Sequence, residues 1–237
     1  MGAERPRAAP RRPGGDPAVL IRPAPARGYR LVVLDFDGTL ADTFPWFCGV
    51  LDAVADRYRF RRVAAHETDE LRRLSARAIM ARLGVPRWKL PLIARHMHGL
   101  AARDAALLHP FPGTSEMLAG LGEAGVATAV LSSNTEANVR RVLGPDAARI
   151  GRYACGASVF GKARRLASLL RHARIEPRAV LCVGDELRDL DAARAVGCAF
   201  GAVAWGYTDA ATLSAARPDL MFAEPAQIVE AVLSARR

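Results

Sequence analysis

Leu31-Val32-Val33-Leu34-Asp35-Phe36-Asp37-Gly38-Thr39-Leu40 is the stretch that decides the fold of this 237-residue chain. Its four leading apolar residues predict a buried strand of a parallel sheet. Two aspartates one residue apart and a glycine turn follow. Carboxylates at the end of a buried strand are costly unless a partner balances their charge, and Mg²⁺, which takes oxygen ligands, is a suitable partner. The stretch therefore predicts a strand that ends at a charged, cation-dependent site.

The same residues could in principle form two other structures, an acidic turn or a calcium-binding loop. Asp and Gly are ordinary turn residues, so the stretch could be an acidic turn that closes a strand. A calcium-binding loop is excluded, because its sixth residue should be glycine and its twelfth a carboxylate. Counting from Asp35, these positions are Leu40 and Trp46.

Short apolar runs alternate with amphipathic stretches along the rest of the chain. This alternation is typical of βαβ units, and we expect an α/β fold with a Rossmann-like parallel sheet flanked by helices. The predicted strands are 31–35, 126–131, 179–184, 199–204 and 220–223, and the predicted helices are about 114–124, 135–143, 161–173, 187–196 and 225–235.

One long interval between Asp42 and Phe111 lacks any convincing strand. A structureless loop of this length is improbable in a compact domain, so a small all-helical insert after the first strand is expected. Apolar residues recur at helical spacing in its middle part. The predicted helices are about 45–59, 67–83 and 87–108, which gives a helical domain at 44–109 and a core domain at 29–43 and 110–237.

Polar residues follow the second predicted strand and open a later helix. Ser132 and Ser133 come after the strand 126–131, where hydroxyls and helix N–H groups can hold phosphate oxygens or simply cap a helix. Lys162 opens the helix 161–173, a position that the helix dipole disfavours unless an anion lies opposite. It is one of only two lysines in the chain, although a plain surface role stays open.

A second acidic motif, Gly184-Asp185-Glu186-Leu187-Arg188-Asp189, follows the apolar strand 179–184. Asp185 and Asp189 are four residues apart and share one face of a starting helix, so they repel each other unless a cation lies near. Ligands of open α/β sheets bind beyond the carboxyl ends of the strands. We therefore expect this motif to meet Asp35.

These four motifs, in this order, resemble those of the haloacid dehalogenase-like (HAD) hydrolases. The helical insert resembles the cap of their phosphoglycolate phosphatase-like branch, and the resemblance covers roughly residues 30–230. It implies a nucleophile at Asp35, a general acid and base at Asp37, and Mg²⁺ held by Asp35, the Asp37 main chain and Asp185, with support from Asp189. It also implies phosphate binding by Ser132, Ser133, Lys162, Gly38 and Thr39.

The resemblance implies a Mg²⁺-dependent phosphatase that hydrolyses a small phosphate monoester, such as 2-phosphoglycolate, through an aspartyl-phosphate. Asp37 argues against a dehalogenase, which lacks an aspartate there. A phosphomutase of the same superfamily and a non-catalytic HAD-like binding protein stay as alternatives. Substrate choice is expected in the insert, where Arg72, Arg73 and Arg77 either meet an anionic substrate or form a solvated face.

Composition limits the partners. The chain is 51% hydrophobic and 24% charged, and it contains no apolar run of membrane-spanning length. Its four cysteines form no CxxC pair, which together with the absence of a signal-peptide pattern predicts a cytoplasmic protein. Residues 1–30 hold seven arginines against two acidic residues, half of the net charge of +10. We expect a disordered Arg/Pro-rich arm at 1–28, a small phosphorylated metabolite as partner rather than nucleic acid or membrane, and a monomer or homodimer.

Overall fold

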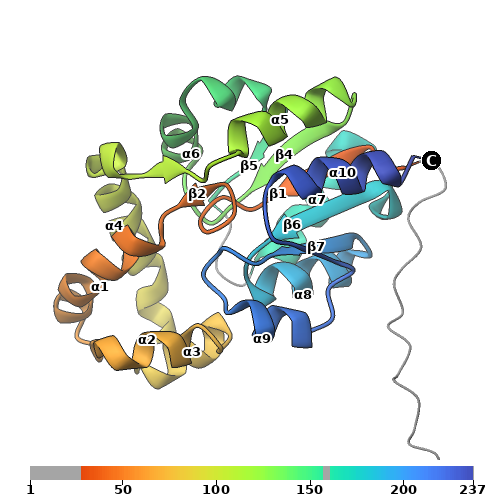
Figure 1. The fold of residues 1–237 in the computed structure, drawn as a ribbon. Coiled ribbons are helices and arrows are strands. Elements are labelled where there is room, and N and C mark those ends of the chain that lie inside the picture. The colour runs from red at the N-terminus through yellow and green to blue at the C-terminus, as the bar shows by residue number, and fades with distance from the viewer. Residues whose placement is uncertain (1–27, 157–160, 237) are drawn as a thin grey trace, which may run out of the picture.

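A six-stranded parallel sheet forms the centre of the computed structural model, which describes residues 28–156 and 161–236. The strand order is β5-β4-β1-β6-β7-β8, so the chain extends the sheet first on one side of β1 and then on the other (Figure 1). The strands are β1 (Leu31–Leu34), β4 (Ala127–Leu131), β5 (Arg152–Ala154), β6 (Val180–Gly184), β7 (Ala199–Val203) and β8 (Leu220–Phe222).

The register of the central strands brings the predicted motifs together. Leu34 at the end of β1 pairs with Val130 of β4 and with Val183 of β6. The residues that follow these three strands therefore emerge side by side at the carboxyl edge of the sheet. Because β1 pairs with β6 as well as with β4, the first and last motifs lie next to each other.

Helices cover both faces of the sheet because β1 is apolar on both. Val32 and Leu34 pack on α5, α6 and α10, whereas Leu31 and Val33 pack on α7, α8 and α9. The bounds are α5 (Thr114–Glu123), α6 (Glu136–Leu143), α7 (Lys162–Ala173), α8 (Leu187–Val196), α9 (Ala210–Ala215) and α10 (Ala226–Ser234), with short 3-10 turns η4 (Gly144–Arg149) and η5 (Pro177–Ala179). The predicted α/β fold is confirmed.

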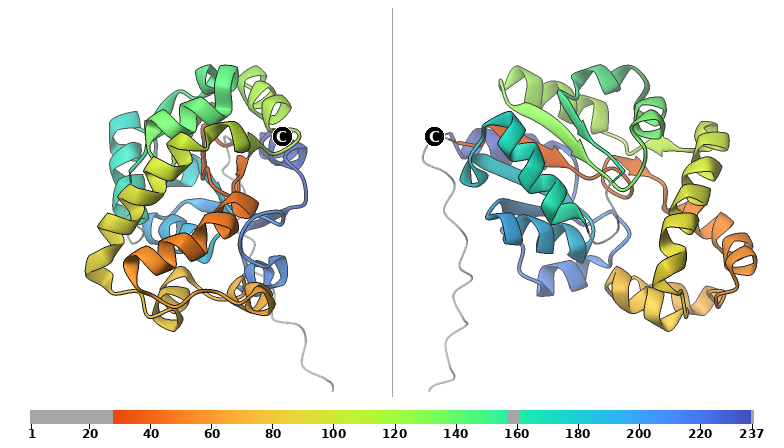
Figure 2. Two further views of the ribbon diagram at one scale, coloured as in Figure 1. Left: turned by 90° about the vertical axis from the view of Figure 1, so that its left-hand side faces the viewer. Right: turned by 180° about the vertical axis from the view of Figure 1, so that it is seen from behind.

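The helical insert that follows β1 forms a separate layer beyond the carboxyl edge of the sheet (Figure 2). The chain enters and leaves it through a two-stranded antiparallel ribbon, β2 (Ala41–Asp42) and β3 (His109–Pro110). Its helices are α1 (Phe44–Tyr58), η1 (Ala65–Glu67), α2 (Thr68–Leu71), α3 (Ala76–Arg82), η2 (Arg87–Lys89), α4 (Leu90–Arg103) and η3 (Ala105–Leu107).

The structure corrects several element predictions. The continuous helix predicted at 67–83 is broken between α2 and α3, because Ser75 has an extended backbone and its side chain caps α3 by accepting from the Ala78 N–H. The helix predicted at 87–108 is divided into η2, α4 and η3. Strand β5, helix α9 and the β2–β3 ribbon were not predicted.

Two further predictions concern the N-terminal arm and membrane-spanning helices. The predicted arm at 1–28 lies outside the described residues except for Gly28. None of the helices in the described ranges combines the length and the apolar character that crossing a bilayer requires.

Candidate active site

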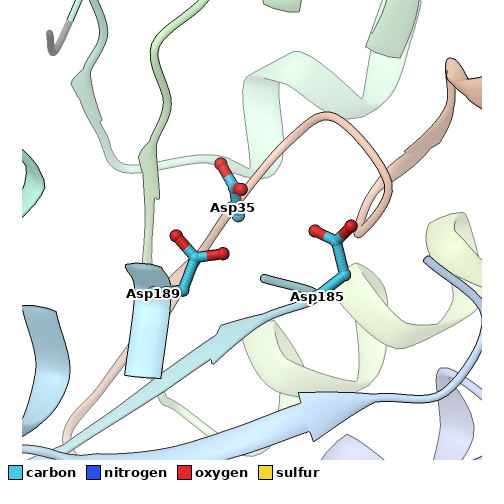
Figure 3. Close-up of side chains that lie close together, drawn as sticks. All are labelled: Asp35, Asp185 and Asp189. Carbon is cyan, nitrogen blue, oxygen red and sulfur yellow. The ribbon is translucent and has the colours of Figure 1, made fainter. Parts of the chain in front are cut away.

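Three buried carboxylates converge at the edge of the sheet. Asp35 follows β1, Asp185 follows β6, and Asp189 lies in the first turn of α8, and one oxygen of each lies within 4.8 Å of the others (Figure 3). Figure 3 shows the three carboxyl groups around a common space. Hard, buried oxygen donors at this separation fit a divalent cation such as Mg²⁺.

Lys162 supplies one positive charge to this group. Its Nζ lies 2.7 Å from Asp35 Oδ2 and donates a hydrogen bond to Asp189 Oδ1, and all three side chains are buried. Burial acts to lower the pKa of Lys162, but the two carboxylates outweigh it and the pKa is raised, so the ammonium stays charged. The predicted convergence of the lysine with the first and last motifs is present in the geometry.

Among the described residues, the hydrogen bonds to Asp185 come from neutral donors. Thr39 Oγ1 donates to its Oδ1 at 2.9 Å, and the Tyr207 N–H donates to its Oδ2 at 2.7 Å. Two glycines permit this close approach: a Cβ on Gly38, whose φ is +78°, would lie 2.2 Å from Asp185 Oδ2, and one on Gly206 would lie 2.1 Å from Asp185 Cβ. The charge of this carboxylate is therefore the one that most needs a cation.

Burial and mutual repulsion perturb these acids. Burial raises the pKa of Asp35 to about 7, although Lys162 opposes the shift, and Asp189 adds to it. The pKa of Asp185 is raised, first by burial and then by the charges of Glu186 and Asp35. A cation among the carboxylates would favour their ionised forms and reverse these shifts.

Asp37 lies beside this group in a more accessible position. It is half-buried, and Asn134 Nδ2 lies 3.4 and 3.3 Å from its two carboxyl oxygens. Burial raises the pKa of Asp37, and hydrogen bonds from Thr43 and Asn134 act against that rise. An acid whose pKa is raised and whose side chain remains accessible is suited to proton transfer.

The predicted phosphate-binding serines close β4. Ser132 is fully buried, and its Oγ accepts the Asn134 N–H at 2.9 Å, which leaves the hydroxyl hydrogen to be donated elsewhere. Ser133 is half-buried beside it. A phosphate contact by these hydroxyls stays a prediction.

The predicted N–H donors of the first loop are engaged within the loop itself. The Gly38 N–H donates to the Ala41 carbonyl at 2.9 Å, and the Thr39 N–H donates to the Phe36 carbonyl at 3.2 Å. Both residues shape the turn, Thr39 also donates to Asp185, and their contact with phosphate stays a prediction.

The three predicted specificity arginines lie in different surroundings. Arg72 joins the insert to the core, because its Nε donates to the Tyr207 carbonyl at 2.9 Å and its Nη2 to the Gly206 carbonyl at 3.0 Å. Arg73 and Arg77 are exposed on the insert. Arg72 thus contacts the loop that holds Asp185, and a substrate contact by any of the three stays a prediction.

Several residues that build the site were not predicted from the sequence. Asn134, Thr43 and Tyr207 contact the acidic residues from three separate segments, and Arg188 pairs with Glu186 at the start of α8. The charges of Glu186, Asp189 and Asp35 raise the pKa of Arg188 despite its burial, which acts to lower it. Asn134 was detectable, because it follows Ser132 at a strand end, but Tyr207 acts through its backbone and left no signal in the residue pattern.

A Rossmann-like sheet with an acidic, lysine-containing site at its carboxyl edge and a helical insert after the first strand defines a HAD-type hydrolase. Residues 32–203 match the family model of the haloacid dehalogenase-like hydrolases, and the chain belongs to this family.

Its relatives include phosphatases. The chain is 31% identical over 208 residues to the phosphoglycolate phosphatase of Synechococcus elongatus, covering 87% of this chain and 98% of that protein. It is 27% identical over 190 residues to the N-acetylmuramic acid 6-phosphate phosphatase of Pseudomonas aeruginosa, covering 75% and 83%. A crystal structure from Lactobacillus plantarum, provisionally described as a phosphoglycolate phosphatase, superposes with a TM-score of 0.74 at 19% identity, covering 86% of this chain and 99% of that one.

Proposed function

We propose that this protein is a Mg²⁺-dependent phosphatase that hydrolyses a small phosphate monoester through an aspartyl-phosphate. The observation that carries the proposal is the buried group of Asp35, Lys162 and Asp185, with the accessible acid Asp37 two residues from the nucleophile. This arrangement combines a nucleophile, a fixed positive charge, a cation site and a proton donor in one place.

In the first step, an ionised oxygen of Asp35 attacks the phosphorus atom of the ester. The bond between phosphorus and the ester oxygen breaks, and the carboxyl proton of Asp37 passes to that oxygen. The alcohol departs, Asp35 carries the phosphoryl group, and Asp37 is left as a carboxylate. The raised pKa of Asp37 supports its starting role as an acid.

In the second step, the Asp37 carboxylate takes a proton from water while the water oxygen attacks phosphorus. The bond between phosphorus and the Asp35 oxygen breaks, inorganic phosphate is released and both aspartates regain their starting states. Lys162 stays beside Asp35 and, with the hydroxyls of Ser132 and Ser133, is proposed to bind the phosphoryl oxygens. Gly38 and Thr39 are proposed to add main-chain contacts.

Asp35, Asp185 and the main-chain carbonyl of Asp37 are the proposed ligands of Mg²⁺, with Asp189 as support through Lys162. When bound, Mg²⁺ screens the negative charge of the carboxylates and of the phosphate that approaches them. The buried oxygen donors fit this ion, and the neutral hydrogen bonds to Asp185 leave its charge available.

We propose 2-phosphoglycolate as the first substrate to test. The phosphoglycolate phosphatase relative aligns over nearly its full length, which supports this choice. The second relative, whose name specifies a sugar acid phosphate, makes N-acetylmuramic acid 6-phosphate the next. We propose residues 44–109 as the cap that selects among them, with Arg72, Arg73 and Arg77 as candidates for contact, above a core domain at 29–43 and 110–237.

The test is phosphate release from a panel of monoesters by the purified full chain, with Mg²⁺ and with a chelator. We expect Mg²⁺-dependent release, and a loss of at least about 10³-fold in Asp35→Asn with an unchanged circular dichroism spectrum. Substantial Mg²⁺-dependent activity in Asp35→Asn would contradict the mechanism. Interconversion of sugar phosphate isomers without release would instead identify a phosphomutase, and inactivity over the whole panel a non-catalytic protein.

A further inference from the structure

A chain of side-chain amides connects Asp37 to the helical insert. Asn134 Nδ2 faces the two carboxyl oxygens of Asp37, and Asn134 Oδ1 accepts a hydrogen bond of 3.0 Å from Asn138 Nδ2. The same Asn138 nitrogen donates at 3.0 Å to the main-chain carbonyl of His98 in α4. Both asparagines are buried, so their amides have few other partners.

The orientation of both amides is fixed by groups that can play only one role. The Thr135 N–H can only donate, and it donates to Asn134 Oδ1 at 2.9 Å, which turns the Asn134 NH₂ toward Asp37. The His98 carbonyl can only accept, which turns the Asn138 NH₂ toward α4. The two hydrogens of Asn138 are thus shared between the insert and Asn134.

This chain makes the geometry of Asp37 depend on the position of α4. Both hydrogens of the Asn138 amide are satisfied only when the His98 carbonyl is in place. Withdrawal of α4 would free the Asn138 amide to turn, and Asn134 Oδ1 would then keep one of its two hydrogen bonds, the one from the Thr135 N–H. The contacts of 3.3 and 3.4 Å to Asp37 are long, so a small rotation of Asn134 would break them.

We propose that Asn134 and Asn138 are positioning residues that align the carboxyl group of Asp37 with the leaving oxygen only when α4 is seated against α6. The proposal rests on the proposed function, because it concerns proton donation to the departing alcohol. Seating of α4 against α6 would thus prepare the acid for proton donation.

A second contact of the same helices provides a matched control. Arg141, one turn after Asn138 in α6, donates from Nη1 to the Ala102 carbonyl of α4 at 3.0 Å. This side chain is exposed and makes the same kind of bond between the same two helices. It has no hydrogen bond to Asn134, so Arg141→Ala weakens the docking of α4 without touching the amide chain.

The experiment measures kcat/KM for a series of aryl phosphates with Mg²⁺, because this parameter reports the step in which the ester bond breaks. Poor leaving groups need the proton of Asp37, whereas dinitrophenolate leaves without it. For Asn138→Ala we expect a loss of about 10-fold with phenyl phosphate and less than about 2-fold with 2,4-dinitrophenyl phosphate. Arg141→Ala should lower kcat/KM for the two esters by the same factor or leave both values unchanged.

A double variant tests whether Asn138 acts through Asn134. Asn134→Ala should show at least the same dependence on the leaving group, and Asn134→Ala/Asn138→Ala should be no worse than Asn134→Ala alone. The dependence on the leaving group is a ratio within one preparation, so partial unfolding does not alter it. If Asn138→Ala fails to fold, Asn138→Asp keeps the shape and removes both donated hydrogens.

Equal losses across the series in Asn138→Ala, or losses that add in the double variant, would overturn the inference and leave only a packing role. The proposed function is tested separately by the wild type. A wild-type protein that hydrolyses no ester would contradict the proposed phosphatase activity. If the wild type is active and every variant shows the same dependence of kcat/KM on the leaving group as the wild type, only the coupling between α4 and Asp37 is contradicted.

Discussion

The carboxyl edge of the sheet and the helical insert are stabilised in opposite ways. At the edge, four charged side chains are buried: Asp35, Lys162, Asp185 and Asp189. Most of their polar atoms lie in a hydrogen bond or an ion pair. In the insert, most charged side chains are exposed, and several of them form ion pairs on the surface. These pairs are Arg61–Glu67, Arg62–Asp56, Arg82–Glu70 and Arg103–Asp104.

The difference separates two tasks. Buried charges fix the positions of the reacting groups, because any displacement leaves a charge without a partner. Exposed ion pairs contribute little to stability and tolerate replacement. The apolar interior of the insert is also thin, with only Val54, Ala55, Leu71, Leu83, Ala101 and Leu108 buried among its described residues. The edge thus holds its charged groups in fixed positions, whereas the insert tolerates changes on its surface, which agrees with the substrate choice proposed for it.

The two lysines of the chain allow the sharpest test of this separation. Lys162→Met should lower kcat/KM by at least about 10²- to 10³-fold, because the ammonium that neutralises Asp35 and Asp189 is lost. Steady-state kinetics on the best substrate of the panel measure the loss.

Lys89→Met makes the same chemical change in the insert, where Lys89 Nζ donates to the Tyr58 carbonyl at 2.6 Å. We expect its kcat/KM to stay within about 2-fold of the wild type. A loss of similar size in both variants would show that the insert and the edge are not separable in this way.

The same separation governs what the sequence could reveal. The four motifs were predicted because a charge directly after an apolar strand is an unusual pattern, and Asp35, Lys162, Asp185 and Asp189 do converge. The parallel sheet followed from alternating apolar and amphipathic runs. Strand β5 was missed because Arg152–Ala154 is short and carries no apolar run.

The insert was harder to predict for a physical reason. Leu71, Leu74 and Ala78 keep helical spacing across the break between α2 and α3, so periodicity alone gave one helix, whereas Ser75 as an N-cap was the signal to use. The partners of Arg72 and Asn138 are main-chain carbonyls distant in the sequence. No residue pattern identifies a carbonyl, so these contacts required the fold.

The buried carboxylates also predict an unusual dependence of stability on pH. The folded pKa of Asp35, about 7, lies above its ordinary value of 3.8, so the folded state binds more protons than the unfolded state between these values. Without divalent cations, the free energy of unfolding should therefore fall as pH rises from about 4 to about 7. Asp37 and Asp185, whose pKa values are also raised, act in the same direction.

Urea unfolding of the wild type and Asp35→Asn in a chelator measures the effect. The variant should be more stable at pH 8 by on the order of 1–3 kcal/mol and should lose less stability across the interval. Saturating Mg²⁺ should stabilise the wild type more at pH 8 than at pH 5. Identical pH dependence in both proteins would remove Asp35 from this explanation.

The smallest expected effect compares two helix caps of similar geometry. Ser75 caps α3 in the insert by accepting the Ala78 N–H at 3.3 Å, and Thr135 caps α6 at the edge by accepting the Asn138 N–H at 3.2 Å. Replacing either with alanine should lower the free energy of unfolding by about 1 kcal/mol. Only Thr135→Ala should also lower kcat/KM for phenyl phosphate, by about 2- to 5-fold, because the first turn of α6 positions Asn138.

Thermal or urea unfolding and the aryl phosphate series measure both outcomes on the same preparations. Equal losses of stability with a loss of kcat/KM in Thr135→Ala alone would show that a lost cap at the edge disturbs the reaction. The same loss in the insert would then affect stability only. If Ser75→Ala altered the dependence on the leaving group as much as Thr135→Ala, the internal order of the insert would control the acid directly, and the separation of tasks between the two regions would fail.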